Sequence, residues 1–129
     1  MKVPTILLVD DEAGQRENIR SYLEPRIECN IAEASNAEEA INFIKNKPCD
    51  IMVLDIKMPG PGGNGIDVLE VSKNMPITSL VYTNWDSDQV YKQCMERNVK
   101  GFIAKSDSLT VIGQKIIAEL KEKKLYFPI

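Results

Sequence analysis

Histidine is absent from this 129-residue sequence. Its absence excludes Ser-His and Cys-His nucleophile pairs, histidine general bases and histidine metal ligands. Any chemistry in this chain must therefore use carboxylates, hydroxyls, lysines and the backbone. Cysteine is scarce, and Cys29, Cys49 and Cys94 are widely spaced with no Cys-x-x-Cys pair. We interpret them as small buried hydrophobic residues rather than as zinc ligands or a disulfide framework.

Long apolar segments and an excess of basic charge are missing as well. No apolar run approaches the roughly 20 residues that a membrane span needs, and too few apolar residues precede Asp10 for a secretory signal. We therefore expect a cytoplasmic protein. The net charge of −3 argues against direct nucleic-acid binding, which needs a basic face. Length and ordinary composition indicate one globular domain.

Short apolar runs alternate with stretches of helical periodicity along the whole chain. The runs are Ile6–Val9, Ile27–Ile31, Ile51–Leu54, Leu80–Tyr82 and Phe102–Ala104. Apolar and polar residues alternate from Ile27 to Ile31, which is typical of an edge strand. The repeated strand–helix order predicts an α/β fold with a doubly wound, five-stranded parallel sheet and helices on both faces.

Capping residues predict where several of the helices begin. Ser35, with Glu38 three residues later, matches a capping box. Asp86 or Ser87 is expected to cap the helix that carries Val90, Cys94 and Met95. The last helix is predicted from an apolar stripe formed by Leu109, Ile112, Ile116 and Leu120.

Polar residues follow four of the apolar runs. They are Asp10, Asp11 and Glu12 after the first run, Asp55 after the third, Thr83 after the fourth and Lys105 after the fifth. Each has an ordinary explanation alone; Asp11, for example, is a suitable helix cap, and Asp55 a suitable turn residue. Ligands of such sheets bind at the carboxyl ends of the strands, however, so these side chains are expected to converge.

The chemistry of this set indicates a phosphoryl site. Acids brought together repel one another and need a cation, and an oxygen-rich site with open water positions suits Mg²⁺. A cation, a lysine and a hydroxyl around one carboxylate would stabilise a phosphoryl group on that carboxylate as an aspartyl phosphate. Without a histidine base, the site is better suited to accept a phosphoryl group than to turn over an external substrate, so we expect no enzyme activity of that kind.

In order and spacing, four segments resemble the receiver domains of two-component response regulators, including the chemotaxis-type single-domain proteins. The segments are Leu7–Asp11, Leu54–Pro59, Thr83 after its apolar run, and Lys105 after Phe102-Ile103-Ala104. The resemblance implies a flavodoxin-like strand order 2-1-3-4-5. It also implies that Asp55 is the phosphoacceptor and receives its phosphoryl group from a sensor histidine kinase or a histidine phosphotransfer protein.

The resemblance further implies roles for the surrounding residues. Mg²⁺ would be bound by Asp10, Asp11, Asp55 and the backbone carbonyl of Lys57. Thr83 and Lys105 would hold the phosphoryl oxygens. Thr83 and Phe102 would form a switch that changes the surface presented to a downstream protein or output domain.

We expect the receiver domain to span residues 1–124, with 125–129 as a C-terminal tail or the start of a linker. The face built from Val90, Phe102 and the helix Leu109–Leu120 is a candidate for homodimerisation.

Besides the positions of Lys57 and Trp85, the sequence departs from the usual receiver pattern in three places. The glycine-rich loop Gly60–Gly65 is longer than is common, Asn84 stands where a very small residue is preferred, and Ser106 replaces a proline. These departures leave open a receiver-like interaction module that does not depend on phosphorylation. A small aspartyl-phosphate phosphatase or phosphotransferase is disfavoured, because the chain has no Asp-x-Asp pair. Dinucleotide or flavin binding is disfavoured because the glycine fingerprint is missing.

Lys57 and Trp85 flank the expected approach to Asp55. Lys57 places a cation, and Trp85 a bulky side chain, beside the path of an attacking water. We predict that the lifetime of the phosphorylated form depends on both residues. Single Lys57→Ala and Trp85→Ala variants, followed by timed hydrolysis of the phosphorylated protein, test this. Unchanged rates in both variants would end the hypothesis.

Overall fold

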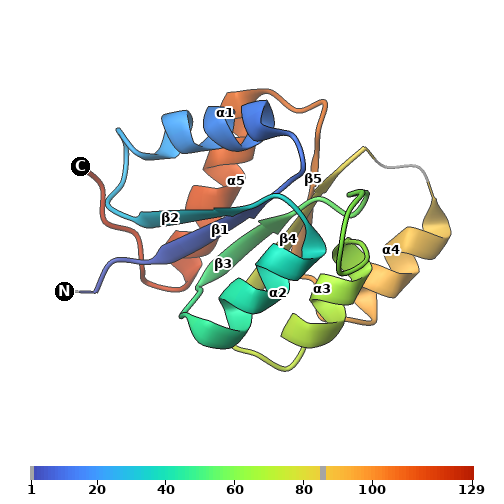
Figure 1. The fold of residues 1–129 in the computed structure, drawn as a ribbon. Coiled ribbons are helices and arrows are strands. Elements are labelled where there is room, and N and C mark those ends of the chain that lie inside the picture. Colours follow the sequence, from blue (N-terminus) through green and yellow to red (C-terminus); the bar gives the residue numbers. More distant parts are fainter. Residues whose placement is uncertain (1, 85–86) are drawn as a thin grey trace.

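Five parallel strands and five helices make up the described part of the chain, residues 2–84 and 87–129 of a computed structural model (Figure 1). The strands are β1 (Thr5–Val9), β2 (Asn30–Ala34), β3 (Ile51–Leu54), β4 (Thr78–Thr83) and β5 (Gly101–Ala104), and the helices are α1 (Ala13–Leu23), α2 (Ala37–Asn46), α3 (Gly65–Ser72), α4 (Asp88–Met95) and α5 (Leu109–Glu122). The strand order β2-β1-β3-β4-β5 confirms the predicted doubly wound sheet.

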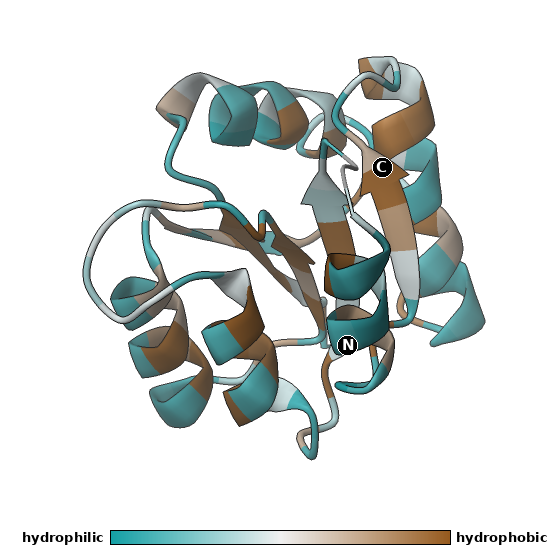
Figure 2. Cartoon of the chain, turned by 90° about the vertical axis from the view of Figure 1, so that its right-hand side faces the viewer, coloured by the Kyte–Doolittle hydropathy of each residue, from teal (hydrophilic) through white to brown (hydrophobic). Residues whose placement is uncertain are grey.

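Side chains of the inner strands are buried on both faces of the sheet. Leu7, Met52 and Val81 belong to the core that α2, α3 and α4 cover. Their neighbours Ile6 and Val53 belong to the opposite core, beneath α1 and α5. Figure 1 shows these two layers of helices, and Figure 2 shows apolar residues along the central strands and on helix surfaces turned toward them. This double burial explains the continuous apolar runs of β1, β3 and β4.

The second strand lies at the edge, as predicted, but not at the predicted residues. It spans Asn30–Ala34 rather than Ile27–Ile31 and pairs with β1. Ile27 is nevertheless buried, because it bridges Pro128 of the C-terminal segment in antiparallel orientation. The apolar residue that begins the alternation is therefore buried by a distant part of the chain and is not part of β2.

The C-terminal segment lies along the turn that precedes β2. The carbonyl of Phe127 accepts the N–H of Glu28 at 2.8 Å, and the N–H of Ile129 donates to the carbonyl of Arg26 at 3.0 Å. Leu125 and Tyr126 pack against the core beneath α1 and α5. These hydrogen bonds and apolar contacts hold residues 125–129 against the segment that precedes β2.

One helix start differs from the predicted one, and another agrees with a predicted alternative. The cap of α2 is Asn36, whose side chain accepts the N–H of Glu39 at 2.9 Å. Ser35 instead donates its N–H to the Glu39 carboxylate, so the predicted Ser35–Glu38 box is wrong by one position. Ser87 caps α4, whereas Asp86 lies outside the described residues. In the two predicted stripes, Met95 and Leu109 are exposed rather than buried.

The glycine-rich loop between β3 and α3 packs on the start of α2. The carbonyl of Pro61 accepts the otherwise unpaired N–H of Glu38 at 3.2 Å. Gly62 has a φ of +90°, and a Cβ at this position would overlap the backbone of Glu38. The loop then enters α3 through a capping box between Asn64 and Asp67. The long loop therefore packs against the first turn of α2 through Pro61 and Gly62.

None of the helices within the described ranges is long and apolar enough to cross a bilayer.

Two helical glycines have opposite surroundings, and this difference gives a stability prediction. A Cβ on Gly113 of α5 would overlap the ring of Tyr22. This ring is held in place, because the Arg26 guanidinium lies 3.8 Å from its centroid and the Gln114 amide donates to its hydroxyl at 2.8 Å. A Cβ on Gly14 of α1 would meet nothing within 4 Å. We predict that Gly14→Ala raises the free energy of unfolding by about 0.5–1 kcal/mol, and that Gly113→Ala lowers it by roughly 1–3 kcal/mol.

Urea unfolding of both variants measures these changes. Because the substitution is the same, helix propensity alone would stabilise both. Equal stabilisation by Gly113→Ala would show that the α1–α5 contact tolerates the added methyl group.

Candidate functional site

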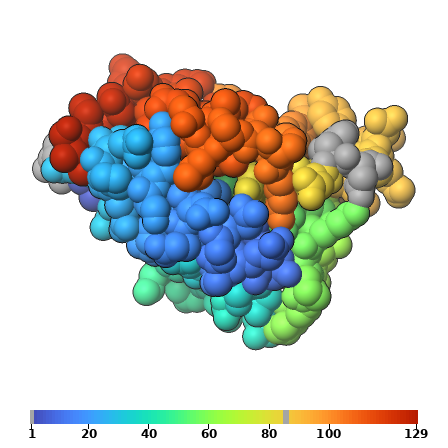
Figure 3. Space-filling view, turned by 90° about the horizontal axis from the view of Figure 1, so that it is seen from above, coloured from blue at the N-terminus to red at the C-terminus, as the bar shows by residue number. Residues whose placement is uncertain are grey.

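The carboxyl ends of β1, β3, β4 and β5 meet at one edge of the sheet. Seen from above, the segments that follow β1 (dark blue), β3 (green) and β5 (orange) come together near the end of β4 (yellow) (Figure 3). A hollow of about 290 Å³ lies there. Its lining consists of Asp11, Glu12, Asp55, Lys57, Thr83, Asn84 and Lys105. The parallel topology therefore brings the predicted side chains together, because each follows directly from a strand end.

Three carboxylates form the centre of the site. One oxygen from each of Asp10, Asp11 and Asp55 lies within 4.8 Å of the other two. Asp10 and Asp55 are buried, with 3% of each residue exposed, whereas Asp11 is exposed. One Asp10 oxygen, Oδ1, accepts the N–H of Glu12 at 2.9 Å, while its buried Oδ2 has no hydrogen-bond partner. This set of hard oxygen donors, with one buried oxygen that accepts no hydrogen bond, fits a divalent cation such as Mg²⁺.

Lys105 holds the acids together from the side of β5. Its Nζ lies 2.9 Å from Oδ2 of Asp55, 3.4 Å from Oδ2 of Asp10 and 3.7 Å from Oε1 of Glu12. The ammonium also lies 5.5 Å from the ring centroid of Tyr82. Only 12% of the Lys105 side chain is exposed. The lysine is thus a fixed counter-ion for two buried carboxylates.

Burial determines the protonation tendencies of these groups. It raises the pKa of Asp10 and of Asp55 above the ordinary carboxyl value, although the Lys105 charge acts in the opposite direction. Burial alone would lower the pKa of Lys105, but the hydrogen bond and charge of Asp55 outweigh it and raise that pKa. The Asp11 charge further raises the pKa of Asp55. The acids therefore repel one another, and Lys105 only partly offsets that repulsion.

Asp55 directs both of its carboxylate oxygens toward donors. Oδ2 accepts from Lys105, and Oδ1 accepts the backbone N–H of Lys57 at 3.3 Å. Thr83 is buried at the end of β4, and its hydroxyl donates to the carbonyl of Asn84 at 3.5 Å. Asn84 itself lines the hollow. Trp85, the other residue expected beside Asp55, lies outside the described residues.

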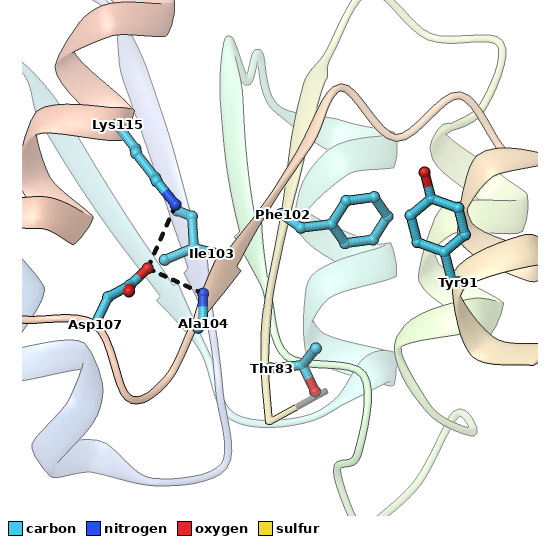
Figure 4. A pocket seen from close by; sticks show the side chains of 7 residues that line it. All are labelled: Thr83, Tyr91, Phe102, Ile103, Ala104, Asp107 and Lys115. Carbon is cyan, nitrogen blue, oxygen red and sulfur yellow. Dashed lines mark hydrogen bonds and ion pairs between the residues drawn. The ribbon is translucent and has the colours of Figure 1, made fainter. Parts of the chain in front are cut away.

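Phe102 lies at a second hollow, away from the acids. This hollow has a volume of about 380 Å³ and contains Thr83, Tyr91, Phe102, Ile103, Ala104, Asp107 and Lys115 in its lining (Figure 4). The rings of Phe102 and Tyr91 stack with centroids 5.0 Å apart. Asp107 accepts from the N–H of Ala104 and from Lys115, each at 3.3 Å. Thr83 is the residue that lines both this hollow and the one with Asp55.

Sequence reasoning missed Tyr82 and Arg16. Tyr82 is buried on the opposite face of β4 from Thr83, and its hydroxyl donates to Gln15 at 2.8 Å. Arg16 donates to the backbone carbonyl of Asp10 at 2.5 Å. The alternation along β4 placed Tyr82 on the α1 side, but no sequence pattern shows that its ring lies beside Lys105.

Comparison with known proteins gives a consistent result. The family model described as "Response regulator receiver domain" matches residues 6–117. A cyclic di-GMP phosphodiesterase from Thermotoga maritima is 29% identical over 119 residues, which are 92% of this chain and 32% of that protein. The chain thus spans about a third of the length of this relative.

Two solved structures share the fold. The CheY-like receiver domain protein from Methanospirillum hungatei superposes with a TM-score of 0.81 at 21% identity, covering 95% of this chain and 98% of that one. The BeF₃-activated DrrB receiver domain superposes with a TM-score of 0.78 at 14% identity, covering 93% of this chain and 99% of that one.

The acid cluster predicts how Mg²⁺ and Asp11 affect stability. Without Mg²⁺, Asp11→Asn should raise Tm slightly, because it removes repulsion from Asp55. With Mg²⁺ at a hundred times its Kd, the wild type should gain about 2.7 kcal/mol. Asp11→Asn should gain much less, so the order of the two Tm values reverses.

Thermal unfolding with and without MgCl₂ measures this reversal. Asp50→Asn is the matched control, because the Asp50 carboxylate accepts the N–H of Thr5 at the amino end of the sheet. It should keep the full Mg²⁺-induced shift. Equal shifts in all three proteins would place the cation elsewhere.

Proposed function

This chain belongs to the response regulator receiver domains, and from that membership we propose that it is a phosphoacceptor whose Asp55 receives a phosphoryl group from a phosphohistidine. The donor would be a sensor histidine kinase or a histidine phosphotransfer protein. The modified domain would then act on a downstream protein or an output domain. It would accept a phosphoryl group and lose it by hydrolysis, without turning over an external substrate.

The observation that carries the proposal is that the three acids differ in burial and in hydrogen bonding. One Asp10 oxygen accepts the N–H of Glu12, and the other is buried. Asp11 is exposed. Asp55 is buried but lines the hollow, with donors on both oxygens and the Thr83 side chain beside the same hollow. Among the three acids, Asp55 is the one that faces both an approaching phosphoryl group and the groups that would stabilise it.

The transfer itself follows from these positions. An oxygen of the Asp55 carboxylate attacks phosphorus, the P–N bond of the phosphohistidine breaks, and the electron pair of that bond goes to the departing imidazole. Lys105 then donates to a phosphoryl oxygen in place of the Asp55 oxygen that it contacts now, and the Thr83 hydroxyl donates to another. Mg²⁺, held by Asp10, Asp11, Asp55 and the backbone carbonyl of Lys57, would neutralise part of the phosphoryl charge.

Thr83 would carry the change to the second hollow. Turning its hydroxyl toward the phosphoryl group changes the wall of the second hollow, where Phe102 stacks on Tyr91. The neighbouring surface of α4 and α5 exposes Tyr91, Met95, Leu109 and Val111. We propose this surface as the part that meets the downstream partner or a second copy of the chain.

A receiver-like module that needs no phosphorylation is the alternative. Asn84 favours it, because its side chain lines the hollow that contains Asp55. This alternative predicts that partner binding is the same with and without a phosphodonor.

Incubation with acetyl phosphate and Mg²⁺, followed by intact-mass measurement, tests the phosphoacceptor function. We expect one added phosphoryl group in the wild type and in Asp50→Asn, and none in Asp55→Asn. Lys105→Met should slow incorporation by at least about tenfold, because it removes a charge-assisted donor. Beryllofluoride should bind the wild type and fail to bind Asp55→Asn.

The other outcomes separate the alternatives. A wild type that stays unmodified would leave the interaction module as the better explanation. Repeated turnover of phosphoesters would instead indicate an enzyme. Incorporation that persists in Asp55→Asn would place the acceptor on another residue.

A further inference from the structure

The turn that carries Asp10 and Asp11 is unusual among the helix starts of this protein. The caps of α2, α3, α4 and α5 each accept a backbone N–H through a side chain; these caps are Asn36, Asn64, Ser87 and Ser108. The cap position of α1 is Glu12, whose side chain makes no such bond. The start of α1 therefore lacks the usual side-chain cap, and within its turn the Asp10 carboxylate accepts the N–H of Glu12.

Arg16 supports this turn from the next turn of α1. Its Nη1 donates to the backbone carbonyl of Asp10 at 2.5 Å, and its Nε donates to Oε1 of Glu33 at 2.8 Å. Only 15% of the Arg16 side chain is exposed. The guanidinium is planar, so its bond to Glu33 also determines the direction in which Nη1 points.

Glu33 in turn has a fixed backbone position, because it lies on β2 opposite Leu8 of β1. Its second oxygen, Oε2, accepts from Nε and Nη2 of Arg20 at 3.0 and 2.8 Å. The paired arginines lower the pKa of Glu33 below its usual value, although burial acts in the opposite direction. A continuous set of contacts therefore runs from the edge strand, through Glu33 and Arg16, to the backbone of Asp10.

We propose that Arg16 is a positioning residue for the cation site: by holding the Asp10 carbonyl, it fixes the turn that aims the Asp10 and Asp11 carboxylates at Asp55. This inference rests on the proposed function, because it assumes that the acids bind Mg²⁺. Arg16 itself does not line the hollow that contains Asp11 and Asp55. It acts through the backbone, as groups behind a metal ligand commonly do.

The sign of the effect separates positioning from simple electrostatics. Arg16 carries a positive charge near an acidic site, so its loss alone should make Mg²⁺ bind more tightly. Loss of positioning should instead make Mg²⁺ bind more weakly, because the carboxylates would no longer be held for one ion. We expect at least roughly tenfold weaker binding in Arg16→Ala, the lower end of the range for groups behind metal ligands.

Arg20→Ala is the matched control. It removes the same charge from the same helix and breaks the ion pair with Oε2 of Glu33, but it leaves in place the bond of Arg16 to Oε1 of Glu33 and the bond of Arg16 to the Asp10 carbonyl. Its Mg²⁺ affinity should stay within about twofold of wild type in physiological salt, where distant charges are screened. Arg16→Lys keeps the charge but cannot hold Glu33 and the Asp10 carbonyl with the same geometry, so it should also bind Mg²⁺ more weakly than the wild type.

Calorimetric titration of the full chain with MgCl₂ measures these affinities, and thermal unfolding without Mg²⁺ shows whether each variant is folded. As a second measurement, the amide signal of Glu12, whose N–H bonds to Asp10, should shift in Arg16→Lys and not in Arg20→Ala. This signal reports the turn directly and requires neither metal nor phosphodonor.

Three results would overturn the inference: Mg²⁺ binding in folded Arg16→Ala that equals or exceeds that of the wild type, equal weakening by Arg20→Ala, or an unmoved Glu12 amide in Arg16→Lys. These results leave the proposed phosphoacceptor function intact if the wild type binds Mg²⁺ and accepts phosphoryl groups. A wild type that binds no Mg²⁺ would overturn both together.

Discussion

Repulsion among three neighbouring carboxylates is the constraint on which the rest of this site depends. Asp10, Asp11 and Asp55 each place an oxygen within 4.8 Å of the other two, and two of these residues are buried. Such an arrangement destabilises the folded chain unless positive charge compensates it. Lys105 supplies part of that charge from β5, at 2.9 Å from Asp55. The rest is left for a cation, so binding and stability are coupled at this edge of the sheet.

The scaffold resists this repulsion because each acid follows directly from a buried strand. β1 and β3 pair in register from Ile6–Ile51 to Val9–Leu54, and the backbone N–H of Asp55 donates to the carbonyl of Val9 at 2.9 Å. The backbones of Asp10 and Asp55 therefore cannot move apart unless this pairing breaks. Stability gained in the two apolar cores thus holds charged groups where they would not gather alone, as is common at functional sites.

Local sequence order was sufficient to predict the residues that meet at the site. Asp55, Thr83 and Lys105 each lie at or next to a strand end, so identifying the strands located them at the shared edge. The errors arose where contacts between distant segments decide the structure. Ile27 is buried by the C-terminal segment rather than within β2. Likewise, the place of Arg16 depends on how α1 packs beside β2, which no periodicity in either segment encodes.

The Lys105–Asp55 contact is where the proposed modification would act first. In this structure the ammonium is bonded to the Asp55 carboxylate. A phosphoryl group on Asp55 would offer the lysine more negative charge than the carboxylate does, and the hydroxyl of Thr83 would gain a stronger acceptor than the Asn84 carbonyl at 3.5 Å. A modification shifts an equilibrium only by interacting differently with its two states. Here that difference would lie in Lys105 and Thr83, and Thr83 would pass it on because the same side chain forms part of the wall beside Phe102.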